Sequence, residues 1–306
     1  MGHDHAHDHR HDHSPKSYGR PFIIGISLNL VFVVVETVYG ISSGSVALVA
    51  DAAHNLSDVL GLAFAWAAFL LAQRKPSRRR TYGFRKTTVL AALGNSVLLL
   101  VAIGGVSWEA VGRLRHPAVI EGRIVMAVAA VGVVINGVSA MLFAKGRKGD
   151  ANLRGAFLHL ASDAAVSFGV VVAGAIILRT GWMWLDPLVS LVVSVVILLG
   201  TWGLLKQSVN LALDAVPEGI DAEAVNTYLA GLPGVLEVHD LHIWAMSTTE
   251  TALTAHLVMA TNTCEPRFLG DVGKVLHDKF KIEHSTLQVE APEAPDPCHL
   301  AAEGTV

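Results

Sequence analysis

The stretch SVALVADAAHNLSDVLGLAFAWAAFLLA, residues 45–72, decides the fold of this chain. It is longer than the ~20 residues that a helix needs to cross a lipid bilayer, and it contains no Lys or Arg. A soluble core does not need an apolar run of this length. We therefore expect a membrane-spanning helix here, and the few polar residues within it need an explanation of their own.

Similar apolar runs recur along the chain. Of its 306 residues, 52% are hydrophobic and only 16% are charged, whereas soluble domains are about 25% charged. The sequence predicts an α-helical polytopic membrane protein with six transmembrane helices, at Pro21–Ile41, Ser45–Ala72, Thr88–Val111, Gly122–Ala144, Leu153–Leu178 and Leu185–Lys206. The formal net charge of −3 carries little information about partners, and no nucleic-acid partner is expected.

Basic residues are concentrated in two of the predicted connections. They are Arg74, Lys75, Arg78, Arg79, Arg80, Arg85 and Lys86 after the second span, and Lys145, Arg147, Lys148 and Arg154 after the fourth. The positive-inside rule then predicts that both termini are cytoplasmic. The short loops and the lack of a visible targeting segment favour a multi-pass protein of a bacterial inner membrane.

From about Leu213 the composition becomes that of a small soluble domain. Helices are expected at Asp221–Ala230 and Arg267–Phe280, and strands at Val235–Trp244, Thr251–Met259 and Ser285–Val289. This αββαβ order predicts a small cytoplasmic α+β domain. We therefore divide the chain into a His-rich cytoplasmic tail (1–19), a six-helix transmembrane domain (20–208), the α+β domain (209–291) and a disordered tail (292–306).

Ionisable residues recur at the same spacing in two of the predicted spans. His54 and Asp58 lie four residues apart, on one helical face, and His159 and Asp163 repeat the pattern. Such groups are costly at membrane depth unless they are paired or functional. A single pair could equally be a hydrogen bond between helices. Two imidazoles and two carboxylates, however, complete a tetrahedral shell that suits Zn²⁺, and the repetition favours a metal site.

Four motifs give the chain a family resemblance. They are Asp51-Ala-Ala-His54-Asn-Leu-Ser-Asp58, Thr81-Tyr-Gly-Phe-Arg-Lys86, Leu90-Ala-Ala-Leu93 and His239-Asp-Leu-His-Ile-Trp244. Together they resemble the signatures of the cation diffusion facilitators, in the same order and over almost the whole chain. The resemblance implies a homodimer in the lipid membrane that exchanges metal ions for protons by alternating access. It also implies that residues 209–291 bind metal and support dimerisation.

The resemblance also assigns site residues. The transport-site positions of the family fall on His54, Asp58, His159 and Asp163, and His at both first positions resembles the zinc-preferring branch. Two departures follow from the family pattern. Thr88 stands where an acidic residue is common, so a structural pair made there is expected to be absent. The connection 73–86 contains no His or Asp, so no second metal site is expected in it.

The predicted cytoplasmic domain contains a second group of candidate ligands. By resemblance, His239, His256 and Glu290 match cytoplasmic metal positions of the family. His242, Glu283 and His284 lie near them in sequence, and Cys298 and His299 in the tail could supply further ligands. Histidines are also common on soluble domain surfaces without any metal, and this alternative stays open.

Histidine alternates with other residues at the start of the chain, at His3, His5, His7, His9, His11 and His13. Interleaved with aspartate, these imidazoles are typical of a flexible metal-capturing segment. An expression tag is the alternative, although tags are usually uninterrupted histidine runs.

The sequence thus predicts a protein that is not an enzyme and that exports Zn²⁺ by proton antiport, with Cd²⁺ or other divalent cations as further candidate cargoes. A metal-gated channel or a sensor could use the same ligands. An intramembrane metalloprotease is disfavoured because no His-Glu-x-x-His motif is present. Asp51, one turn before His54, could orient its ring or could be a helix N-terminal charge at the membrane surface.

Overall fold

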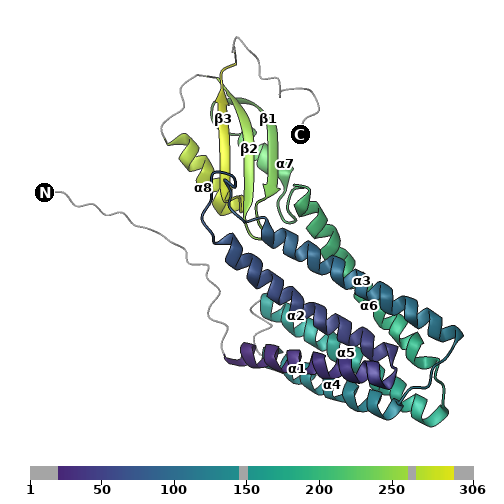
Figure 1. Cartoon of the computed structure of the whole chain (residues 1–306). Coiled ribbons are helices and arrows are strands. Elements are labelled where there is room, and N and C mark those ends of the chain that lie inside the picture. The colour runs from purple at the N-terminus through teal and green to yellow at the C-terminus, as the bar shows by residue number, and fades with distance from the viewer. Residues whose placement is uncertain (1–19, 145–150, 261–266, 293–306) are drawn as a thin grey trace. The chain divides into compact units, whose positions relative to one another are not determined.

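A computed structural model of the chain describes residues 20–144, 151–260 and 267–292 (Figure 1). Six long helices come first: α1 (Arg20–Ser43), α2 (Val46–Ala72), α3 (Thr87–Arg115), α4 (Gly122–Ala144), α5 (Ala151–Thr180) and α6 (Leu185–Ala212). Helices α2 to α6 contain stretches long and apolar enough to cross a membrane. The apolar stretch described in α1, Leu30–Ser43, is shorter. Among the described residues, the structure therefore has five candidate spans, and the apolar stretch of α1 is shorter than these.

Four of these helices extend beyond the C-terminal ends expected from hydropathy, α1 and α5 by two residues and α3 and α6 by more. Helix α3 continues past Val111 to Arg115, and α6 continues past Lys206 to Ala212. Hydropathy marks where a segment leaves an apolar layer, whereas backbone hydrogen bonding can continue into polar surroundings. The apolar pattern therefore predicts the existence of a span better than its last residue.

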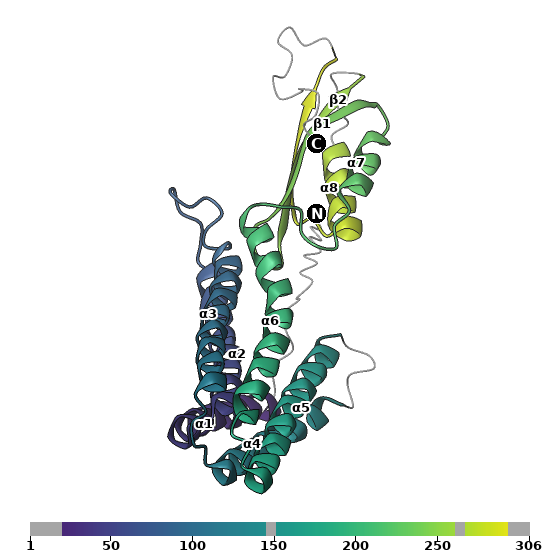
Figure 2. The same ribbon diagram turned by 90° about the vertical axis from the view of Figure 1, so that its right-hand side faces the viewer.

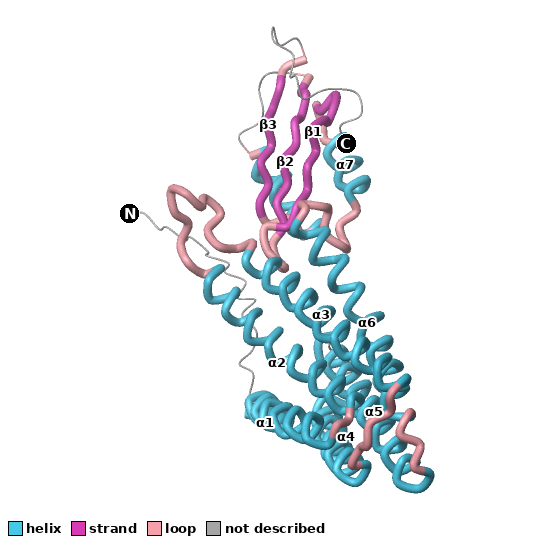
Figure 3. The backbone as a smooth tube through the Cα atoms, turned by 45° about the vertical axis from the view of Figure 1, so that its right-hand side comes forward, coloured by secondary structure: helices cyan, strands magenta, loops and turns pink. Residues whose placement is uncertain are grey.

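The described residues form two compact units, and the first comprises the chain up to Val59 together with Glu109–Val193. In this unit α4 packs against both α1 and α5 (Figure 3). Its buried apolar core includes Phe32, Leu48, Ile120, Val125, Ala129 and Val170. A Cβ atom at Gly132 would lie 2.8 Å from the ring of Phe32, so α1 and α4 can approach this closely only because that residue has no side chain.

The beginning of α2 is fixed by hydrogen bonds that involve Ser45, the residue directly before the helix, and Asp186 of α6. Gly44, at φ +71°, reverses the chain after α1, and Ser45 Oγ accepts a hydrogen bond from the Leu48 amide at 3.1 Å. The buried carboxylate of Asp186, in α6, accepts a hydrogen bond from the Val46 amide at 2.8 Å and another from the Ser45 hydroxyl. These bonds satisfy amides that a helix start leaves free. They therefore set the position of everything that follows on α2.

Large apolar side chains stand exposed along the long helices. Trp108 is 83% exposed, Val101 69% and Trp66 67%. Soluble proteins rarely expose contiguous apolar surface on this scale, and such surface marks contact with a partner or a membrane. Because these residues lie on helices of spanning length, the apolar faces fit contact with lipid.

The second unit comprises Leu60–Trp108 and the chain from Ser194, and it contains a small C-terminal domain. The elements of this domain are α7 (Ala222–Ala230), β1 (Val235–Ala245), β2 (Thr251–Met259), α8 (Phe268–Phe280) and β3 (His284–Glu290). The strands lie in the order β1-β2-β3, with β1 antiparallel and β3 parallel to β2. Helices α7 and α8 cover one face of this sheet (Figure 2). The expected αββαβ order is therefore present.

Within the second unit, the connection between α2 and α3 contacts the C-terminal domain. Arg85 Nη1 lies 3.1 Å from Glu250 Oε2, and Lys86 pairs with Asp214. Thr88 Oγ1 accepts a hydrogen bond from the Thr248 amide at 3.1 Å. Thr88 stands where an acidic residue is common in the family. Here its hydroxyl accepts a neutral hydrogen bond from the C-terminal domain.

Candidate metal centres

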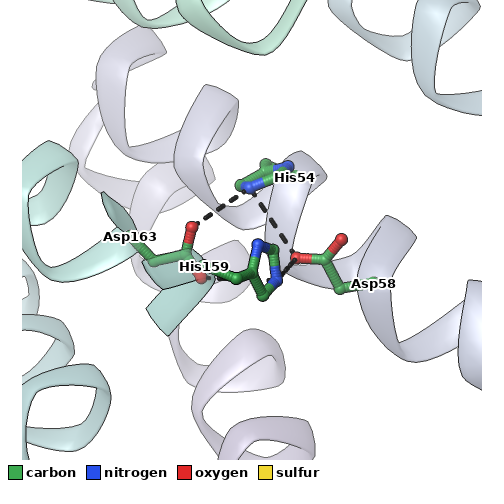
Figure 4. A group of neighbouring side chains, drawn as sticks. All are labelled: His54, Asp58, His159 and Asp163. Atoms are coloured by element: carbon green, nitrogen blue, oxygen red, sulfur yellow. Dashed lines mark hydrogen bonds and ion pairs between the residues drawn. The ribbon is translucent and has the colours of Figure 1, made fainter. Parts of the chain in front are cut away.

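The first site is formed by α2 and α5 of the first unit. Helix α2 carries His54 and Asp58, and α5 carries His159 and Asp163. The spacing of four residues places each pair on one helical face. Figure 4 shows the four side chains directed toward one another. The structure thus brings together the four residues that the sequence singled out.

Each imidazole of this site contacts both carboxylates. His54 Nε2 lies 3.3 Å from Asp163 Oδ1 and 3.7 Å from Asp58 Oδ2. His159 Nε2 lies 3.2 Å from Asp58 Oδ2 and 3.6 Å from Asp163 Oδ2. The two rings are nearly perpendicular, with centroids 5.9 Å apart. One ligand atom from each of the four residues can be chosen so that all lie within 4.8 Å of one another.

These distances fit a tetrahedral ion. Zinc binds histidine nitrogen and carboxylate oxygen at about 2.0–2.2 Å, which places neighbouring ligand atoms about 3.4 Å apart in a tetrahedron. The four His–Asp contacts, from 3.2 to 3.7 Å, lie on either side of that spacing, with Asp163 using Oδ1 toward His54 and Oδ2 toward His159. One ion bound by all four residues would therefore require the side chains to adjust.

Burial differs across the site. The side chain of Asp163 is 5% exposed and that of His54 17%, whereas that of His159 is 49% exposed. The site is therefore closed around Asp163 and open beside His159.

Asp51 has other partners than the sequence suggested. Its side chain is fully buried, and its Oδ2 accepts a hydrogen bond from the Ser167 hydroxyl at 2.8 Å. The Nδ1 atom of His54 has no hydrogen-bond partner among the described residues. Asp51 therefore does not orient His54 in this structure, and its burial does not fit a charge at the membrane surface.

The second site lies on the C-terminal sheet. His239 of β1 and His256 of β2 are directly paired across the antiparallel ladder, with ring centroids 5.2 Å apart. Glu290 of β3 reaches both: Oε1 lies 2.8 Å from His256 Nδ1, and Oε2 lies 3.6 Å from His239 Nε2. These three residues, predicted from sequence, form the second group in the described part of the chain that could hold a metal ion.

Sequence reasoning did not select Asp240, which joins the edge of this second site. A bulge between His239 and His242 places Asp240 at φ +51°. Its carboxylate lies 3.6 Å from His256 Nε2 and 2.9 Å from His242 Nε2. Strict alternation along β1 would place Asp240 on the face opposite His239, so only the bulge reveals its position.

Other candidate ligands lie elsewhere. Glu283 accepts a hydrogen bond from the Thr251 amide at 2.7 Å, and the ring of His284 makes an edge-to-face contact with the ring of Tyr82. His242 is exposed and contacts Asp240 rather than the second site's other residues. The remaining candidates lie outside the described residues: His3, His5, His7, His9, His11, His13, Cys298 and His299.

Two family models match the chain. The model of the cation efflux transmembrane domain matches residues 22–211, and that of the cation efflux protein cytoplasmic domain, a dimerisation family, matches residues 217–292. The first match covers all four residues of the α2–α5 site, and the second covers His239, His256 and Glu290.

Curated relatives are similar over nearly the whole chain. The metal cation efflux system protein CzcD of Cupriavidus metallidurans is 38% identical over 98% of this chain and 91% of its own length. Zinc transporter ZitB of Escherichia coli is 36% identical over 98% and 96%. A cadmium, cobalt and zinc/H⁺-K⁺ antiporter of Bacillus subtilis is 30% identical over 95% and 92%. A solved metal-bound C-terminal domain of CzcD is 38% identical, covers 23% of this chain and 99% of its own, and has a TM-score of 0.22.

Proposed function

We propose that this chain, which belongs to the cation efflux family, exports Zn²⁺ from the cytoplasm in exchange for protons. The observation that carries the proposal is the convergence of His54, Asp58, His159 and Asp163, with ligand atoms within 4.8 Å of one another, on two helices of spanning length. Relatives named zinc transporters and a zinc/H⁺-K⁺ antiporter support the cargo and the exchange. Export of Cd²⁺ or other divalent cations is part of the same proposal.

The proposed mechanism uses one set of ligands for both cargoes. A metal ion can bind only neutral imidazole and ionised carboxylate, so zinc binding displaces protons from the site. Helix movement then exposes the site to the opposite side, where protonation of His54 or His159 releases the metal. Because proton and metal compete for the same atoms, exchange requires no separate coupling device.

The arrangement in the membrane is also part of the proposal. We place six spans in residues 20–208, with both termini on the cytoplasmic side of a bacterial inner membrane. The basic connection after α2 and the relatives from bacteria support this orientation and location. Residues 209–291 would form the cytoplasmic domain, and residues 292–306 a disordered tail.

The cytoplasmic domain would bind zinc as a regulatory ligand and join two chains in a homodimer. Both ring nitrogens of His239 are buried without a hydrogen-bond partner in the described part of the chain. Buried polar atoms of this kind are normally satisfied, and a metal ion held with His256 and Glu290 would satisfy one of them. The match to a dimerisation family supports the assembly.

Replacing Glu290 with glutamine is expected to weaken zinc binding by the cytoplasmic domain at least about 10-fold, because loss of an outer partner already costs about 10- to 100-fold. Glu290 contacts both imidazoles, and an amide keeps its shape while removing the negative charge. Calorimetric titration of the purified full-length protein would show one class of sites weakened and the other retained. Glu223→Gln, at an exposed position of α7, is the matched control. Equal zinc titrations for Glu290→Gln and the parent protein would contradict the second site.

The histidines of the first 13 residues would capture zinc at the cytoplasmic face. A tethered set of imidazoles raises the local metal concentration without carrying the ion across the membrane. The tail would thus supply zinc to the transport site, and none of its residues is among the four proposed ligands of that site.

Reconstitution tests the proposed function directly. Purified protein in liposomes, loaded with zinc and pH indicators, should show saturable zinc uptake accompanied by proton movement in the opposite direction. Uptake that does not saturate and is independent of the proton gradient would indicate a channel. Zinc binding without any flux would indicate a sensor.

A further inference from the structure

Two buried carboxyl groups in the first unit take no part in the metal site. Glu36 of α1 and Asp51 of α2 are both 0% exposed. Neither forms an ion pair with a Lys, Arg or His in the described part of the chain. Burying one unpaired carboxylate is costly, and burying two side by side is more so. Their presence together therefore requires a chemical explanation.

The hydrogen bonds of these two groups leave one oxygen of each without a donor. Glu36 Oε2 accepts from Asn55 Nδ2 at 3.0 Å, and Asp51 Oδ2 accepts from the Ser167 hydroxyl at 2.8 Å. Glu36 Oε1 and Asp51 Oδ1 are buried and have no such partner among the described residues. The two carboxyl groups are also within hydrogen-bonding reach of each other.

Ionised carboxylates can only accept hydrogen bonds, so two of them cannot bond to each other unless one carries a proton. A single proton between the groups would remove one buried charge and join the two groups through a hydrogen bond. Nothing else in the described part of the chain donates to their remaining oxygens. The geometry therefore matches a carboxyl pair that shares one proton.

We propose that Glu36 and Asp51 form a proton-binding site, separate from the metal ligands, that takes up and releases one proton in each transport cycle. This inference rests on the proposed exchange of zinc for protons and adds one proton to those displaced from the metal ligands. On release, the O–H bond of the pair breaks and the proton passes to water, and the charge of the pair changes from −1 to −2. Reprotonation on the other side of the membrane reverses the step.

The positions of the two hydrogen-bond donors connect this pair to the metal site. Asn55 directly follows His54 on α2, and Ser167 lies one turn beyond Asp163 on α5. The same two helices therefore hold the metal and supply the donors of the carboxyl pair. Any movement that separates α2 from α5 would remove the Ser167 bond and admit water to the pair.

Among the described residues, few other charged groups act on the pair. His54 and Asp163 interact electrostatically with Asp51, and Asp51 is the group that acts on Glu36. Helix α4, which packs against α1 and α5, contains Arg123 near its first residue as its one charged side chain. A test must therefore change the pair while leaving His54 and Asp163 in place.

The decisive experiment measures how many protons cross per zinc ion in liposomes. Glu36→Gln keeps the shape of the side chain and can still bond to Asn55 and Asp51, but it cannot titrate. The proton-to-zinc ratio is expected to fall by one, with zinc flux retained. Thr37→Val is the matched control, because the Thr37 hydroxyl bonds to the Val33 carbonyl of its own helix. Its ratio should equal that of the parent protein.

An unchanged ratio in Glu36→Gln would overturn the inference and make the pair a structural contact between helices. If this variant does not fold, Asp51→Asn tests the same proton. Infrared spectra of the zinc-free parent protein should also contain a protonated-carboxyl band at neutral pH, and its absence would overturn the inference without any variant. Zinc flux in the parent without proton movement would instead reject the proposed antiport itself.

Discussion

Replacing Asp163 with alanine is expected to lower zinc flux at least about a hundredfold. Loss of an outer partner of a metal site already costs about 10- to 100-fold in affinity or activity, so loss of a ligand costs more. Asp163 is the most buried of the four candidate ligands, and it contacts both imidazoles, at 3.3 and 3.6 Å.

The neighbouring residue provides the control for this experiment. Ser162 is exposed, and its hydroxyl bonds to the Leu158 carbonyl of its own helix at 2.9 Å. Ser162→Ala should transport zinc at the rate of the parent protein. Both variants should be purified and compared in liposomes after their size-exclusion profiles have shown that they are folded. Near-normal flux in Asp163→Ala would reject the α2–α5 site as the route of the metal.

The transport-site candidates could be predicted from sequence for two reasons: they are polar residues in apolar helices, and they are spaced four residues apart. Membrane helices are apolar, so the polar residues His54 and Asp163 stand out against their surroundings. A spacing of four residues then fixes their common face without any knowledge of the fold. His239 and His256 were assigned instead through the family resemblance, together with the expectation that they lie on two adjacent strands. Their close approach across the ladder needed the register, which the structure supplies.

The features that sequence did not reveal depend on distant contacts or on local irregularity. Glu36 is a single acidic residue in an apolar helix, and nothing in the sequence connects it to Asn55 or Asp51. Their proximity arises from the packing of α1 against the rest of the first unit. Asp240 was missed for a different reason: a bulge breaks the alternation of β1 and turns its carboxylate toward His256. Periodicity rules cannot predict where such a bulge occurs.

Replacing His159 with aspartate is expected to raise the ratio of Cd²⁺ flux to Zn²⁺ flux roughly tenfold, which corresponds to a change of about 1.4 kcal/mol in relative stabilisation of the two ions. His159 is the most exposed of the four candidate ligands, so the shorter carboxylate can be accommodated without opening a closed cavity. The substitution replaces nitrogen by oxygen and allows bidentate binding. Zinc prefers four ligands in a compact tetrahedron, whereas a larger ion with weaker geometric demands tolerates a wider site of higher coordination number.

A comparison of three proteins separates ligand chemistry from simple enlargement of the site. His159→Asn also shortens the side chain but adds no negative charge, so its cadmium preference should remain close to that of the parent protein while both fluxes fall. Competitive uptake of the two metals into liposomes at equal concentrations gives the ratio directly. An equal ratio in His159→Asp and the parent protein would place selectivity outside the four-residue site. A raised ratio in His159→Asn as well would show that size, rather than the added carboxylate, discriminates between the ions. His159 is the most exposed of the four candidate ligands, so its chemistry should influence which ion enters the site.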